Sequence, residues 1–159
     1  MTDHVAGFVI GELIAVIAEA FEGAGSGSYF TDHGAAAGWF GTLDRLNAAE
    51  ASQPIGGTSV AAHVHHMIFS LEASTAWMAG DRSRRDWADS WRVSDVDPTV
   101  WTRMRADLRL GYENLRQVVQ REATSSEDAL GGAIGVLAHA AYHLGAVRQK
   151  LICRQRGIG

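Results

Sequence analysis

Cysteine and lysine are nearly missing from this chain of 159 residues, which has one of each, Cys153 and Lys150. A single cysteine excludes an internal disulfide and fits a reducing compartment. We therefore expect a cytoplasmic protein.

An excess of positive charge is also missing. The chain has 14 basic and 18 acidic residues, for a formal net charge of -4. Such a chain has no overall basic field to attract nucleic acid or anionic lipid. We therefore expect no nucleic-acid partner.

Apolar runs are short, because charges interrupt them. In the first 21 residues Glu12 and Glu19 break the longest such run, and no basic segment precedes it. This pattern predicts neither a signal peptide nor a membrane span.

The composition, with 47% hydrophobic and 20% charged residues, is typical of a globular protein. The length predicts one domain over residues 1–159.

Strand-like alternation and internal repeats are absent, and helical periodicity takes their place. Four long segments carry it: about 3–22, 60–80, 98–119 and 125–156. Thr58 or Ser59 is a candidate cap for the second segment. Asp97 before Pro98 predicts the start of the third segment. Ser125 with Asp128 resembles a capping box and predicts the start of the fourth segment.

Two longer connections, residues 23–57 and 81–97, join these segments. The first is too long for an idle loop, and AAAGWFGTLDRLNAAEA within it predicts one short helix. The pattern as a whole predicts an all-α four-helix bundle with long crossover connections. In such bundles, metal and cofactor sites are built from inward-facing side chains of neighbouring helices.

Two histidines stand out in LAHAAYHLGAVRQ, residues 137–149. His139 and His143 are four residues apart, so they share one helical face at about 6 Å, and their apolar neighbours indicate burial. Each buried imidazole needs partners for its two ring nitrogens, and a shared cation supplies one such partner to each residue. The alternative is structural, with one histidine bonded to a carbonyl group and the other facing solvent or a subunit.

The segment VAAHVHHMIF adds three more histidines. His63 and His66 are three apart and lie near one face, whereas His65 points away and is expected at the surface, as are His4 and His33. A third imidazole from this segment would complete three nitrogen ligands with positions left open, as in catalytic zinc sites.

Other metal chemistries are disfavoured. Ala140 stands where H-E-x-x-H zinc proteases carry their glutamate, so that general base is missing. The Glu and Glu-x-x-His sets of di-iron proteins are missing too, which argues against a two-metal site.

TSVAAHVHHM and HAAYHLGAVRQ resemble the corresponding segments of the DinB-like superfamily of bacterial four-helix metalloproteins, and the likeness covers essentially the whole chain. In that family one histidine follows an apolar-x-His-apolar pattern about eight residues into the second helix. VHHM puts His66 there, with His63 as the second choice. The resemblance implies a metal site of His66, His139 and His143 that holds zinc or nickel, and an up-down-down-up order of helices.

The family motif usually closes with His-x-Gly-Gln, whereas this chain has Gly145 followed by Ala146. The glycine is expected to let a helix or ligand approach closely. Known members include thiol S-transferases that use bacillithiol, and a mycothiol-dependent isomerase is a relative. The resemblance thus implies a mononuclear metal-dependent transferase or hydrolase for a small-molecule substrate, with a low-molecular-weight thiol, in a homodimer.

The alternative is a non-catalytic metal-binding or dimerising stress-response protein. Aromatic residues in the long connections are candidates for a substrate wall or, alternatively, for lids that seal the core: Tyr29, Phe30, Trp39, Trp87 and Trp91. Three acidic residues are candidates to assist the metal ligands: Asp32, Asp44 and Glu72.

Overall fold

The computed structural model describes residues 2–157, and within that range every helix or strand element is a helix. The all-α class predicted from the sequence is confirmed. Four helices are long, and their bounds lie close to the predicted segments: α1 (Thr2–Glu22), α4 (Val60–Met78), α5 (Pro98–Glu122) and α6 (Glu127–Gln155).

The first connection holds more structure than the single short helix predicted for it. It contains a 3-10 helix and two short α-helices: η1 (Ala35–Ala37), α2 (Trp39–Leu43) and α3 (Ala48–Ser52). The extended backbone of Gly38 separates the first two. A capping box of Asn47 and Glu50 starts the third, because each side chain satisfies a backbone N–H of the other.

Side-chain caps explain where the long helices begin. Asp97 accepts from the Val100 N–H, and Pro98 follows at the first helical position, as predicted. Ser59 caps α4. The cap of α6 is Ser126 and not Ser125 as predicted. Its backbone is extended and its hydroxyl accepts from the Ala129 N–H, which is the geometry that a cap requires.

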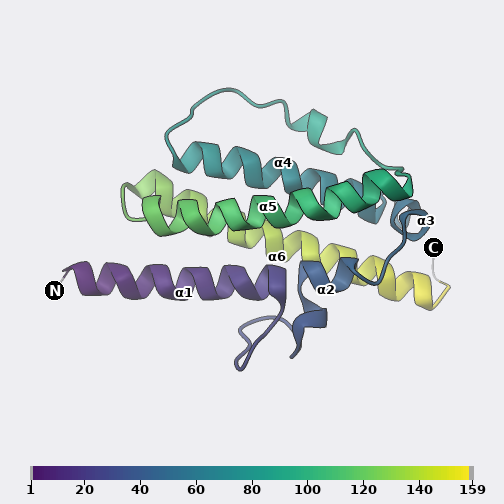
Figure 1. Cartoon of the computed structure of the whole chain (residues 1–159), viewed down its shortest axis with the longest axis horizontal. Coiled ribbons are helices and arrows are strands. Elements are labelled where there is room, and N and C mark those ends of the chain that lie inside the picture. The colour runs from purple at the N-terminus through teal and green to yellow at the C-terminus, as the bar shows by residue number, and fades with distance from the viewer. Residues whose placement is uncertain (1, 158–159) are drawn as a thin grey trace.

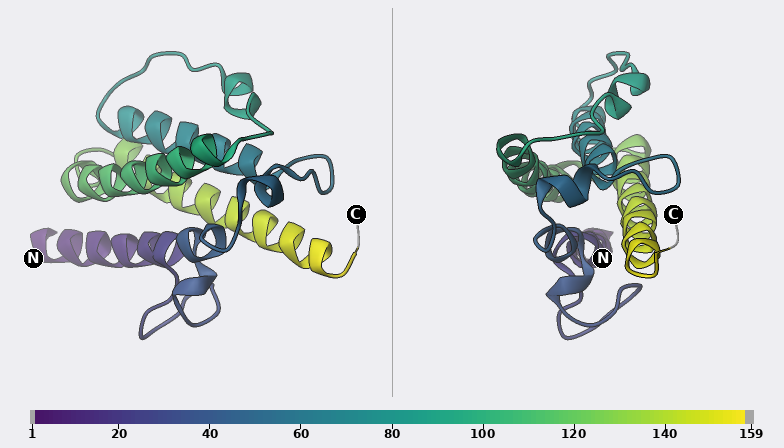
Figure 2. Two further views of the ribbon diagram at one scale, coloured as in Figure 1. Left: turned by 45° about the vertical axis from the view of Figure 1, so that its right-hand side comes forward. Right: turned by 90° about the vertical axis from the view of Figure 1, so that its right-hand side faces the viewer.

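The four long helices lie side by side, with α4 packed against α5 and α6, and α1 against α6 and α5. In Figure 1, α1 and α6 run in one direction and α4 and α5 in the other, and the connection from α4 to α5 returns along α4. This connection contains η2 (Trp87–Trp91), which packs on α4 (Figure 2). The largest fully buried side chains include Phe21, Trp39, Met67, Leu108 and Tyr112.

Two helical stretches, His4–Glu22 and Glu127–Gln155, are long and apolar enough to cross a membrane by length and composition. Core helices of soluble proteins meet the same criterion. About a third (33%) of the most apolar window of each stretch is buried inside the protein. The expectation that the chain spans no membrane stays a prediction.

Candidate metal centre

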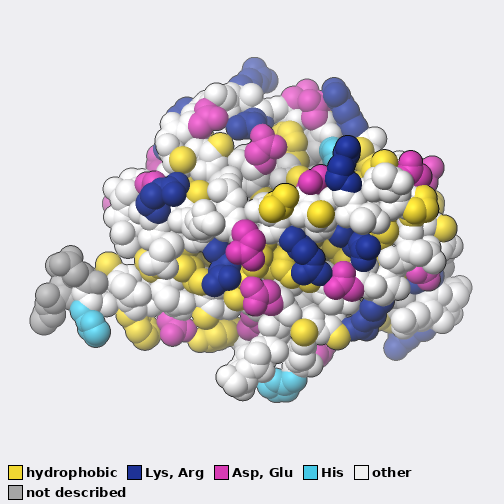
Figure 3. All heavy atoms as spheres, viewed as in Figure 1, with side chains coloured by type: hydrophobic (Ala, Val, Ile, Leu, Met, Phe, Trp, Pro, Cys, Tyr) yellow, Lys and Arg dark blue, Asp and Glu magenta, His cyan; other side chains and the backbone are white. Residues whose placement is uncertain are grey.

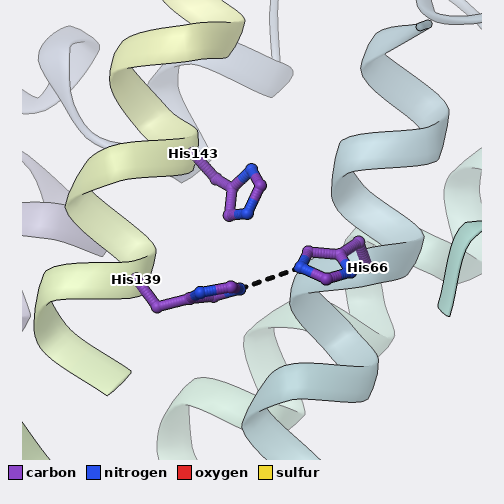
Figure 4. Close-up of side chains that lie close together, drawn as sticks. All are labelled: His66, His139 and His143. Atoms are coloured by element: carbon purple, nitrogen blue, oxygen red, sulfur yellow. Dashed lines mark hydrogen bonds between the residues drawn. The ribbon is translucent and has the colours of Figure 1, made fainter. Parts of the chain in front are cut away.

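Four histidines from two helices meet between α4 and α6. His63 and His66 lie on one face of α4, and His139 and His143 lie on the facing side of α6 (Figure 4 shows three of them). The spacings of three and four residues put each pair one helical turn apart. His63, His66 and His143 are buried, while His139 is half-buried.

His66, His139 and His143 bring their ligand nitrogens within 4.8 Å of one another. The Nε2 atoms of His66 and His139 are 2.9 Å apart. Around a tetrahedral zinc ion, Zn–N bonds near 2.0–2.1 Å put two nitrogens about 3.3 Å apart. The separation of 2.9 Å and the limit of 4.8 Å are compatible with that value, so the three imidazoles fit a single transition-metal ion as donors.

His66 is held in one tautomer by Ser90. The Ser90 hydroxyl donates its only proton to the Trp87 carbonyl oxygen at 2.6 Å. It must therefore accept from His66, whose Nδ1 lies 2.7 Å from Oγ. The lone pair of His66 is then on Nε2, the nitrogen that faces His139. A hydrogen bond of this kind on the outer nitrogen is typical of metal-binding histidines.

His63 and His143 meet through their Nδ1 atoms, which are 3.0 Å apart. The other nitrogen of His63, Nε2, is 3.1 Å from Thr58 Oγ1. Both predicted candidates from α4 thus reach the cluster. His66 joins His139 and His143 in the three-nitrogen group, and His63 contacts that group from outside.

The histidines of the cluster favour their neutral forms. Burial is the main cause, and it lowers the pKa of all four. Together with positive charge on neighbouring groups, Lys150 and His66 for His63 and other histidines for His66 and His143, it brings the pKa of His63 and of His66 to about 4 and that of His143 to about 3. Near neutral pH the cluster therefore presents imidazole lone pairs, which a metal ion requires.

Comparison of the chain with protein-family models, curated proteins and solved structures finds no match.

Two tryptophans of η2 cover the cluster from outside. Trp91 stacks on His66 with ring centroids 4.1 Å apart and meets His63 edge-on at 5.4 Å. Trp87 lies 6.0 Å from His66. Both indoles remain partly exposed, at 47% for Trp87 and 39% for Trp91. Of the five aromatic candidates, these two contact the histidines.

The other three aromatic residues lie elsewhere. Trp39 is fully buried and donates from Nε1 to the Ala140 carbonyl oxygen, so it seals the core. Tyr29 and Phe30 are exposed and belong to a loop whose backbone binds Glu19.

The three acidic candidates pair with arginines. Asp32 binds Arg148, Asp44 binds Arg105 and Arg109, and Glu72 binds Arg85. Within residues 4–157 the one buried acid is Glu19, whose carboxylate accepts from residues 28–31. The group around the candidate metal position is therefore built from imidazoles.

Two further expectations from the sequence concern the remaining histidines and Gly145. His65 is half-buried, since its ring donates to the Ser90 carbonyl oxygen at 2.7 Å, whereas His4 and His33 are exposed as predicted. A Cβ atom at Gly145 would meet nothing within 4 Å. The expected close approach at this glycine is therefore wrong for the protein's own helices, because the position faces open space.

Sequence reasoning missed Ser90 as a partner of the site and treated Thr58 only as a candidate cap. Ser90 is 24 residues from His66 along the chain, and no local pattern marks it.

A cleft of ≈ 460 Å³ lies beside this region, and Thr58 and Trp91 line it. Both residues contact His63, whereas the histidines themselves do not line this cleft.

Proposed function

We propose that the protein is a mononuclear metal-dependent enzyme of the DinB-like kind, a four-helix bundle in which His66, His139 and His143 hold zinc or nickel. The observation that supports this proposal is the convergence of three neutral imidazoles from two helices, with their ligand nitrogens within 4.8 Å. Three neutral ligands leave the full charge of a divalent ion available, and the set matches the three-histidine sites of catalytic zinc proteins.

His66, His139 and His143 would hold the divalent ion, which would supply Lewis acidity and favour the anionic form of water or of a thiol. The cleft lined by Thr58 and Trp91 is the place nearest the cluster that we assign to a small-molecule substrate and a low-molecular-weight thiol. Trp87 and Trp91 offer apolar rings to the substrate and shield the outer side of His66 from water. Ser90 keeps the His66 lone pair directed inward.

Elemental analysis tests the metal site. Protein purified without chelator or added metal should contain close to one equivalent of zinc or nickel, and His66→Ala, His139→Ala and His143→Ala should each lose it. The exposed His33 provides the matched control, since His33→Ala should keep the metal. Wild-type protein without metal, or metal at full occupancy in His143→Ala, would overturn the assignment.

Metal binding should also stabilise the fold, because only the folded chain assembles the three ligands. A free metal concentration of 100 times Kd corresponds to about 2.7 kcal/mol of added stability. We expect zinc or nickel to raise the Tm of the metal-free wild type and of His33→Ala, but not that of His143→Ala. Differential scanning calorimetry measures this shift, and equal shifts in all three proteins would argue for nonspecific binding.

A non-catalytic metal-binding protein is the second candidate. The observation that favours it is the location of the one buried acid of residues 4–157, Glu19, which is bound by its own loop. The three acidic candidates pair with arginines, so none of these four acids is assigned as a general base. Turnover of an electrophile and a low-molecular-weight thiol by metal-loaded protein, lost in His139→Ala, supports the enzyme. Full metal content without turnover across a panel of thiols supports the binding protein.

The proposal includes a homodimer formed through the N-terminal part of α1. Val5, Phe8 and Val9 are exposed there, and an apolar groove of ≈ 600 Å³ lies next to them, lined in part by Ala123 and Leu130. A second copy of this chain supplies an equally apolar surface to cover this patch.

A further inference from the structure

His63 is a buried residue outside the three-nitrogen group, and both of its ring nitrogens are engaged. Nδ1 meets Nδ1 of His143 at 3.0 Å, and Nε2 meets Thr58 Oγ1 at 3.1 Å. The edge of its ring contacts Trp91. A buried imidazole with two side-chain partners has a defined ring orientation.

The proton on each nitrogen follows from the role of His143. If His143 binds metal through Nε2, its Nδ1 carries the proton and donates to His63 Nδ1. His63 then accepts at Nδ1, so its own proton is on Nε2 and is donated to Thr58 Oγ1. The chain from His143 through His63 to Thr58 is consistent at every step.

Thr58 is itself anchored to the body of the protein. It pairs with Ile55 across a tight turn, where the Ile55 N–H donates to the Thr58 carbonyl oxygen at 3.0 Å. Gly56 and Gly57 in this turn have positive φ angles of 59° and 86°, which favour glycine. Lys150 of α6 donates to the Ile55 carbonyl oxygen. The acceptor for His63 is therefore held by the helix that carries His143.

We infer that His63 is a positioning residue of the metal centre, which holds His143 by accepting its Nδ1 proton so that Nε2 faces His66 and His139. This inference rests on the proposed metal site. His63 does for His143 what Ser90 does for His66. Partners of this kind orient the ligand and raise its basicity, and their loss typically weakens metal affinity about 10- to 100-fold.

Paired variants at position 63 test the role. Asparagine places its side-chain oxygen near the position of imidazole Nδ1, so His63→Asn keeps the acceptor, whereas His63→Leu removes it. Kd for Co²⁺ and Zn²⁺ is measured by competition with a chromophoric chelator, together with the visible spectrum of the Co²⁺ form. The Tm of each metal-free protein reports whether the variant folds. Thr58→Val removes the second bond without altering the ring.

We expect His63→Leu to bind one equivalent about 10- to 100-fold more weakly, with an altered Co²⁺ spectrum. His63→Asn should restore most of the affinity and the spectrum, and Thr58→Val should show a smaller loss. Unchanged affinity in His63→Leu, or in Thr58→Val if the leucine variant does not fold, overturns the inference. Loss of the bound equivalent in both position-63 variants also overturns it and makes His63 a ligand. Wild-type protein that binds no metal instead overturns the proposed function, and this inference with it.

Discussion

His66 and His143 each direct one ring nitrogen towards the three-nitrogen group. The other ring nitrogen forms a hydrogen bond with a side chain outside that group, Ser90 for His66 and His63 for His143. The half-buried His139 completes the group from the next turn of α6. The orientation of these imidazole rings is therefore fixed by their hydrogen bonds and by burial. Burial keeps the rings neutral, and the outer bonds orient them, so the imidazoles are arranged in advance for a ligand that accepts lone pairs.

Glu19 is another buried ionisable residue whose side chain is held by hydrogen bonds. It is buried, at 4% exposure, and its carboxylate accepts from the backbone N–H groups of Tyr29, Phe30 and Thr31 and from the Ser28 and Thr31 hydroxyls. Burial acts to raise the pKa of Glu19, but these hydrogen bonds outweigh it and lower the pKa to about 2. The charged form thus ties the first connection to α1.

The depressed pKa makes this contact sensitive to acid. Its stabilisation is complete above the unfolded pKa near 4.5 and is lost as pH falls towards the folded pKa of about 2. Glu19→Gln should lower the free energy of unfolding at pH 7 by about 1–3 kcal/mol, since buried N–H donors lose a charged acceptor. The difference from wild type should shrink between pH 4.5 and 2.

Urea denaturation of both proteins at pH 7, 5, 4 and 3 measures this difference. The histidines titrate in both chains, so their effect cancels. Glu12→Gln is the control, because Glu12 is an exposed acid on the same helix whose carboxylate accepts from the Tyr29 hydroxyl, and it should change stability little. A Glu19→Gln deficit that stays constant down to pH 3 would contradict the role of the charge.

The short helix α2 docks by close backbone contact. A Cβ atom at Gly41 would lie 2.2 Å from the Ala35 carbonyl oxygen and 2.6 Å from the Ala36 Cα of η1. Such backbone atoms cannot yield as a flexible side chain does. The glycine therefore sets how tightly the first connection folds against itself, and it helps to place Trp39 below α6.

Gly41→Ala should therefore destabilise the protein by about 1–3 kcal/mol through overpacking. Gly135→Ala in α6 is the matched control, because a Cβ there meets nothing within 4 Å. That substitution should instead stabilise the helix by about 0.5–1 kcal/mol. Thermal unfolding of the two variants gives opposite shifts in Tm if this reasoning holds, and a Gly41→Ala variant as stable as wild type would refute it.

The N-terminal end of α1 extends past the neighbouring helix ends (Figure 1). Figure 3 shows hydrophobic side chains along this helix, while basic and acidic side chains gather in the strip between α1 and α5. Phe8 is 66% exposed and Val5 is 59% exposed. An apolar surface of this kind beside an apolar groove is typical of an interaction site.

The proposed homodimer predicts that wild-type protein elutes at twice the chain mass of 17.1 kDa in size-exclusion chromatography with light scattering. Phe8→Glu should shift it to the monomer mass, because a charge at this surface must be desolvated on association. Leu110→Glu is the control, since Leu110 is equally exposed, at 68%, but lies on α5. A monomeric wild type at tens of micromolar, or a monomer produced by Leu110→Glu alone, would count against this interface.

Local contacts are what the sequence could predict. The all-α class, the start of α5 at Asp97 and Pro98, and the shared face of His139 and His143 all follow from residues within four positions of one another. Local spacing left His63 and His66 as alternatives, and the resemblance to the DinB-like superfamily implied His66, which lies in the three-nitrogen group. Sequence reasoning placed the α6 cap one residue early, because Ser125 and Ser126 are equivalent by residue type and only the backbone conformation separates them.

The tertiary structure decided what lies between distant residues. Ser90 reaches His66 across 24 positions, and His63 meets His143 across 80. The sequence treated His63 and His66 as alternatives, whereas the packing of α4 on α6 uses both, one within the three-nitrogen group and one beside it. Periodicity tells which face a side chain occupies. The side chain that it contacts on the neighbouring helix or connection depends on how these elements pack. That packing is a property of the whole chain.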